Sequence, residues 1–310
     1  MSRFRGKGVR QKDTPKKVEY ILANFLVKNT ITLLYAPPKQ GKSMFSCGLS
    51  KWIYKNTDLY IEYFDNDNPL TALSDRGVSK LWEELEDRFD YIHPEGLEAA
   101  TRDDKVVVVD CKDALELLVK DADTLTKNYD DTVFIFDSAT DFCDESNDNS
   151  VKIFMGKMKT LRLAGATVII LHHTNKKDPN YKGSTVFKSA SDNIYKLTME
   201  YEDLDAKTYK LEVDSARFRV SDCAFALKEN YDLEILEWDE VCIPVSTQKE
   251  ISSITTVLSQ NKEPMTQGEL LEKALNTNST NKTATALLEK YDGKYWTSKK
   301  EGRSKIYSII

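Results

Sequence analysis

A short segment near residue 40 has the residue types of a phosphate-binding loop. Residues 36 to 43 read APPKQGKS, between the apolar run ITLLY and the helix-patterned stretch MFSCGLSKWIYK. In the pattern GxxxxGK[ST], placed between a strand and a helix, backbone amides surround phosphates while a lysine and a hydroxyl reach phosphate and magnesium. Ala36 stands at the first glycine and excludes only backbone torsions that alanine cannot adopt. The segment therefore predicts a nucleotide site.

The mechanics of such loops assign a role to each position. We expect Lys42 to contact the β- and γ-phosphates, Ser43 to bind Mg²⁺, and the amides of residues 39–41 to bind phosphate oxygens at the helix N-terminus. The alternative is a loop that contains GKS by chance. The residues predicted to bind the nucleotide are Ala36, Pro37, Pro38, Lys39, Gln40, Gly41, Lys42, Ser43 and Met44.

A second motif strengthens the first. The run VFIFD ends in Asp137, and an acidic residue at the end of an apolar strand can complete a Mg²⁺ shell opposite Ser43. The alternative for Asp137 is a turn residue at a strand end. Together the two motifs predict ATP and Mg²⁺ as cofactors.

The elements that position these motifs read as an α/β core. Apolar runs alternate with helical stretches, which predicts a largely parallel sheet covered on both faces. The runs cover residues 31–35, 59–64, 106–110, 133–137 and 167–171. After Asp192 the strand-like runs lie too close together for crossover helices, so antiparallel strands should extend the sheet.

Three segments are expected along the chain. Residues 1–17 form a basic arm, residues 18–245 the α/β core, and residues 250–310 a small winged helix of three helices and a hairpin, with a Thr266/Glu269 capping box. No apolar stretch is long enough to span a bilayer. The basic N-terminus lacks the apolar segment of a secretory signal, so we expect no membrane association and a cytoplasmic location. The five cysteines lack CxxC spacing and suggest neither zinc nor disulfides.

The segment FDSATDFCDESNDNSVKIFMGKMKTLRLAGATVIILHHTNKK, taken with APPKQGKS, resembles the RecA-like ATPases of the RepA and DnaB hexameric helicase group over about residues 18–235. The resemblance implies a homo-oligomeric ring, expected to be a hexamer, with ATP between neighbouring subunits. It also implies movement on single-stranded DNA and replication proteins as further partners.

The resemblance also implies catalytic roles near the phosphates. Asp65, with Asp67 as the second candidate, would orient the attacking water in place of the family's glutamate; an ordinary acidic turn is the alternative. Either His172 or His173 would sense the γ-phosphate. Adjacent residues on a strand point to opposite faces, so the two histidines are not expected to share a metal.

DNA contacts are expected from two lysine-bearing regions. The loop TNKKDPNYKGSTVFKSASD resembles the family's channel loop, and the C-terminal unit offers a basic helix start and wing; solvated charge or protein docking are the alternatives. The predicted DNA-binding residues are Lys176, Lys177, Lys182, Lys188, Lys282, Lys299, Lys300, Arg303 and Lys305.

In SARFRV, Arg217 and Arg219 have the family's spacing on a late strand. Alternate strand residues share a face, so both guanidinium groups could reach a neighbour's γ-phosphate. Two exposed arginines at a sheet edge are the alternative.

Together these motifs and the resemblance predict an ATP-dependent replicative-type DNA helicase. The alternative is a DNA-binding ATPase without unwinding activity, such as an initiator, helicase loader or regulator.

Overall fold

The computed structural model describes residues 17–85, 87–95, 100–102, 105–107, 110–174, 184–202, 206–241, 243, 245–261, 263–302 and 304–310. The chain divides into two compact units, Met1–Val241 and Cys242–Ile310. The predicted arm at residues 1–17 lies outside the described residues except for Lys17.

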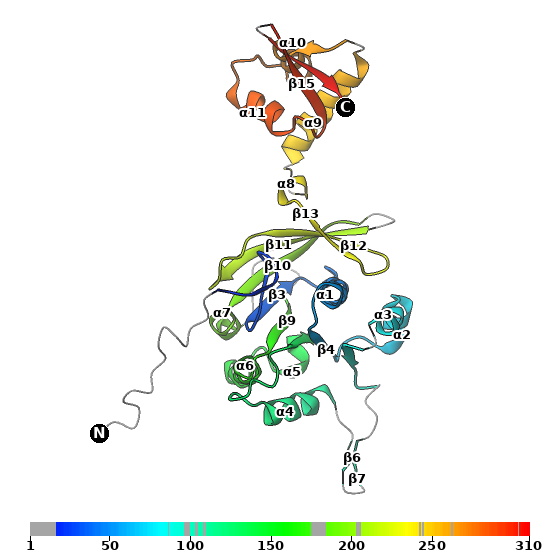
Figure 1. Cartoon of the computed structure of the whole chain (residues 1–310), viewed down its shortest axis with the longest axis vertical. Helices are drawn as coiled ribbons and strands as arrows, with labels where there is room; N and C mark the ends of the chain where they lie inside the picture. The colour runs from blue at the N-terminus through cyan, green and yellow to red at the C-terminus, as the bar shows by residue number, and fades with distance from the viewer. Residues whose placement is uncertain are drawn as a thin grey trace, which may run out of the picture. The chain divides into compact units, whose positions relative to one another are not determined.

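A nine-stranded sheet forms the centre of the first unit (Figure 1). Neighbouring strands run parallel from β10 through β3, β9, β8 and β4 to β5, and antiparallel from β10 through β11 and β12 to β13. The predicted α/β class is confirmed. In sheet order the strands are β13 (Leu233–Leu236), β12 (Cys223–Lys228), β11 (Ala206–Ala216), β10 (Asn193–Glu202), β3 (Ile31–Ala36), β9 (Thr167–His173), β8 (Thr132–Asp137), β4 (Tyr60–Asp65) and β5 (Phe89–Ile92).

One predicted strand of the sheet is wrong. The described residues of the run at 106–110 do not enter it: β7 (Lys105–Val107) pairs with β6 (Ala100–Arg102) in a separate two-stranded ribbon. Asp110 instead caps the next helix, accepting a hydrogen bond of 2.8 Å from the Asp113 amide. The parallel edge position is taken by β5, whose Phe89 is buried in the core.

Helices cover both faces of the sheet, because successive strand residues face opposite sides. On β3, Leu34 and Ala36 join one buried cluster, and Leu33 and Tyr35 join the other. The first cluster includes α1 (Lys42–Asn56), α2 (Leu70–Asp75) and α3 (Val78–Glu84). The second includes α4 (Cys111–Asp121), α5 (Ala139–Phe142), α6 (Asp148–Leu163) and α7 (Thr185–Ala190), on the opposite side in Figure 1.

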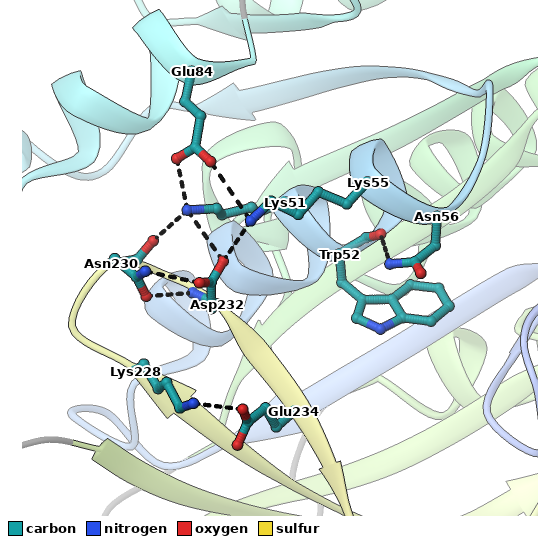
Figure 2. A network of polar contacts seen from close by, with 9 residues as sticks. All are labelled: Lys51, Trp52, Lys55, Asn56, Glu84, Lys228, Asn230, Asp232 and Glu234. Carbon is teal, nitrogen blue, oxygen red and sulfur yellow. Dashed lines mark hydrogen bonds and ion pairs between the residues drawn. The ribbon is translucent and has the colours of Figure 1, made fainter.

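The helix that starts at the phosphate loop is held at its far end by an ion-pair network (Figure 2). Lys51 of α1 is 2% exposed, and its ammonium lies 2.6 Å from Glu84 on α3 and 3.2 Å from Asp232 beside β13. It also donates to the Asn230 carbonyl at 2.8 Å, and Lys55 lies 2.8 Å from Asp232. A buried ammonium is tolerated only with such partners, so the network fixes α1 against α3 and the β12–β13 turn.

The second unit has its own core around Trp296 and Tyr307, both fully buried. Its elements are α9 (Val245–Gln260), β14 (Met265–Thr266), α10 (Gln267–Leu275), α11 (Lys282–Lys290), β15 (Trp296–Glu301) and β16 (Ser304–Ile309), with sheet order β14-β16-β15. The capping box of Thr266 and Glu269 is present at α10.

Two shorter features belong to the first unit: β1 (Tyr20–Leu22) pairs with β2 (Leu26–Val27), and α8 is Trp238–Val241. Within the described ranges, no helix combines the length and apolar character that crossing a membrane requires.

Candidate nucleotide site

The phosphate loop lies between β3 and α1, as predicted. Gly41 caps α1 with φ 70°, and a Cβ there would lie 2.4 Å from the Tyr209 hydroxyl, so glycine is required by torsion and by space. Ala36 is the last residue of β3 and therefore has extended backbone. This explains why the first glycine of the motif is dispensable here.

Lys42 lies at the carboxyl edge of the sheet. Its ammonium donates to the Ala36 carbonyl at 3.1 Å and contacts His173 Nδ1 at 2.9 Å. Burial lowers the pKa of Lys42 to about 8, and the negative charges of Asp137 and Asp67 oppose that shift. The cation is thus held where the carboxyl ends of parallel strands meet, the usual place for a ligand in open α/β sheets.

Asp137 is the last residue of the apolar strand β8 and lies at the same carboxyl edge of the sheet. Its carboxylate accepts a hydrogen bond of 2.8 Å from the Tyr63 hydroxyl. Burial and the neighbouring Asp65 raise its pKa to about 7, while hydrogen bonds from Ser43 and Tyr63 oppose the rise. The hydroxyl of Ser43 and the carboxylate of Asp137 are therefore neighbours, and hard oxygen ligands of this kind suit Mg²⁺. When bound, the ion would neutralise charge on the phosphates.

The two acids at the end of β4 and in the turn after it have different environments. Asp65 is fully buried, and its carboxylate accepts hydrogen bonds from the amides of Asp67 and Asn68, the Asn68 side chain and the Tyr91 hydroxyl. Asp67 is exposed and lines the cavity over the phosphate loop. The order of preference expected from the sequence is therefore reversed: Asp67 can meet a water at the phosphate, whereas Asp65 holds the turn in place.

The two histidines face opposite sides of β9. His172 is fully buried edge-on to Phe187, and its Nε2 lies 3.3 Å from Glu145 Oε1. Burial lowers the pKa of His172 to about 4, so at neutral pH this contact is not an ion pair. His173 lines the cavity. Because the Lys42 ammonium can only donate, His173 Nδ1 accepts and Nε2 carries the proton.

A cavity of about 500 Å³ lies over the phosphate loop; Asp65, Asp137 and His172 are not among its lining residues. The lining contains Pro38, Lys39, Gly41, Lys42, Ser43, Met44 and the predicted Asp67 and His173, together with four residues that sequence reasoning missed: Asn68, Arg76, Met199 and Lys207. Asn68 and Arg76 follow β4 closely, and Arg76 donates to Asn68 Oδ1 at 3.0 Å. No local motif marks Met199 and Lys207, because they reach the cavity only through pairing of β10 with β11.

The chain matches the family model described as AAA domain over residues 7–179. The chain belongs to the AAA domain family. Its match contains the phosphate loop, Asp137 and both histidines, and the family consists of P-loop ATPases with a RecA-like core. No curated protein matches the chain. The AAA domain assignment is broader than the helicase group that the motifs resemble.

The two residues of the predicted arginine finger, Arg217 and Arg219, lie outside the residues that the AAA domain model matches. They also do not lie on a strand, although the sequence predicted that they would. β11 ends at Ala216, and residues 217–219 form a bend, so the alternate-face argument is wrong here. The guanidinium group of Arg217 lies 3.2 Å from the carboxylate of the buried Asp192, and it donates a hydrogen bond of 2.8 Å to the Ser189 carbonyl. Arg219 is exposed, and its carbonyl accepts from Tyr20. Of the pair, Arg219 stays the candidate for a contact in trans.

The predicted DNA-binding residues fall into three groups. Lys176, Lys177, Lys182 and Arg303 lie outside the described residues. Lys188 on α7 pairs with Asp214, and Lys305 lies 3.7 Å from Asp292, so carboxylates offset both charges. Lys282, Lys299 and Lys300 are exposed on the second unit.

Proposed function

We propose that this AAA domain protein is an ATPase of the RepA and DnaB helicase group that works as a ring, expected to be a hexamer, on single-stranded DNA. One observation carries the proposal. β9 lies between β3 and β8, and its last residue, His173, contacts Lys42 at 2.9 Å. The chain then continues directly into the lysine-bearing segment expected to contact DNA.

The roles of the site residues follow from their positions. Lys42 and the loop amides bind the triphosphate, Ser43 and Asp137 hold Mg²⁺, and Asp67 orients the attacking water. His173 has its Nε2 proton available, since Lys42 occupies Nδ1. Loss of the γ-phosphate changes the hydrogen-bond partner of the His173 Nε2 proton. β9 transmits this change to the segment that follows it.

Hydrolysis in this proposal depends on assembly through Arg219. A mixture of Lys42→Ala and Arg219→Lys subunits tests this. At some interfaces the intact Lys42 of one variant would face the intact Arg219 of the other. We expect the mixture to regain ATPase activity that neither variant has alone. A mixture with no activity at any ratio would count against a shared site.

We also propose that the second unit is a winged helix. The order α9, β14, α10, α11, β15, β16 supports this, with α11 as the third helix and β15–β16 as the wing. Lys282 begins α11, and Lys299 and Lys300 lie on β15. In such folds the third helix enters the major groove and the wing contacts the backbone.

Unwinding of a forked duplex tests the helicase proposal against its alternative, a DNA-binding ATPase without unwinding activity. Strand separation that requires ATP supports the helicase; ATP hydrolysis with DNA binding but no separation supports an initiator, loader or regulator. Binding to a dT oligonucleotide should weaken with salt, with a log–log slope of roughly −0.7 per phosphate contact. A flat response between about 50 and 200 mM salt would exclude the lysine channel.

A further inference from the structure

The β10–β11 hairpin extends past the strand that carries the phosphate loop. β10 pairs with β3 only as far as Lys196 opposite Tyr35, yet it continues to Glu202. The overhang is fixed to the loop, because the Met199 amide donates to Gln40 Oε1 at 3.0 Å. The hairpin therefore forms a wall of the cavity beside the phosphate loop.

Pairing within the hairpin sets which side chains face that wall. Met199 lies directly opposite Tyr209, and Tyr209 lies against Gly41 and the Phe45 ring, at 5.5 Å between centroids. Directly opposed residues share a face of the sheet, and so do residues two apart on one strand. Met199, Tyr209 and Lys207 therefore share the face that covers α1.

The lining of the cavity contains two groups of residues. Asp67 and His173 lie near Lys42, which is where the γ-phosphate belongs. In the second group the Lys207 ammonium lies 3.7 Å from Met44 Sδ, and Met199 also lines the cavity. A triphosphate held with its γ end at Lys42 can direct its nucleoside toward this second group.

We propose that Met44 and Met199 form the base subsite of the nucleotide, with Lys207 beside the α-phosphate. Thioethers are polarisable and make favourable contacts with aromatic rings, so they suit the face of an adenine. A cavity of about 500 Å³ has the size of an ordinary ligand pocket. The inference rests on the proposed nucleotide-binding function of the phosphate loop.

Calorimetric titration with two ligands tests the subsite separately from the phosphate cradle. The ligands are MgATP, which has a base, and magnesium tripolyphosphate, which has none. Met199→Ser should weaken ATP binding roughly five- to tenfold and leave tripolyphosphate binding unchanged, while Met199→Leu retains most of the affinity. Thr198→Ala is the matched control, because Thr198 points to the opposite face of β10. Thermal unfolding of each variant verifies its fold.

Different results refute different parts of the argument. If Met199→Ser binds ATP as the unmodified protein does, or loses the same factor for both ligands, the base subsite is wrong. If the unmodified protein binds tripolyphosphate as tightly as ATP, the subsite fails while the phosphate cradle stands. If it binds neither ligand, the proposed nucleotide function fails together with this inference.

Discussion

Asp65, at the end of β4, and Asp67, in the turn after it, offer the sharpest test of the site. We compare Asp65→Asn with Asp67→Asn, which make the same chemical change two residues apart. Asp65 is buried and accepts four groups' hydrogen bonds, whereas Asp67 is exposed at the cavity. The first substitution should therefore damage the fold and the second the reaction.

The magnitude for Asp65 follows from its contacts. In asparagine, one oxygen becomes an amide donor that faces other donors, here the Tyr91 hydroxyl or the Asn68 amide. Hydrogen bonds to a charged group contribute about 1.5–3 kcal/mol each. Neutralising Asp65 also relieves its repulsion of Asp137, which offsets part of the loss. We expect a net loss of roughly 2–4 kcal/mol, or about 5–15 °C in Tm for a unit of this size.

Asp67→Asn should leave Tm nearly unchanged, because an exposed substitution costs within about 0.5 kcal/mol. It should lower kcat about 10²- to 10⁴-fold, as loss of a general base does. Calorimetry and steady-state ATP hydrolysis measure the two effects. The reasoning is refuted if Asp67→Asn keeps full kcat, or if Asp65→Asn keeps the Tm of the unmodified protein while losing activity.

Three further predictions concern stability and the loop. Burial raises the pKa of Glu62 to about 7, so its neutral form stabilises the fold at low pH and this contribution is lost as pH rises through about 7; Glu62→Gln should raise Tm more at about pH 8 than at about pH 5, and an equal change at both would contradict this. Lys51→Ala should cost about 2–4 kcal/mol, because it removes the buried cation that joins Glu84, Asp232 and the Asn230 carbonyl, whereas Glu84→Ala should cost less in denaturant titrations, because Glu84 is half-exposed and is one partner of three. Gly41→Ala should abolish ATP binding through its positive φ as well as its clash with Tyr209, so Tyr209→Phe should not rescue it in equilibrium dialysis.

Local patterns in the sequence determined much of the fold and of the phosphate edge. The strand before the phosphate loop and the strand ending in Asp137 both form as expected, because each is specified by its own residues. The prediction of a sheet strand at 106–110 was wrong because it rested on local preference alone. Four valines favour a strand, but Asp110 is a strong helix N-cap, and propensity does not say which run pairs at the sheet edge.

Residue roles that depend on long-range pairing could not be predicted. The sequence does not show which of Asp65 and Asp67 is buried, because Asp65 is held partly by Tyr91, from the neighbouring strand β5, as well as by Asn68. Arg217 has the spacing of a finger, yet the buried Asp192 competes for it. In both cases a buried polar group needed a partner, and that need decided the position of a side chain.

The same dependence explains why the cavity combines distant parts of the chain. The AAA domain match ends at residue 179, whereas Met199 and Lys207 lie beyond it. The Tyr231 hydroxyl, in the β12–β13 turn, donates to the Arg76 carbonyl at 2.8 Å, and Arg76 also lines the cavity. The turn is also bound to α1 through the Lys51 network. The strands after residue 192 therefore supply cavity-lining residues and hold other lining residues in place, as the parallel core does.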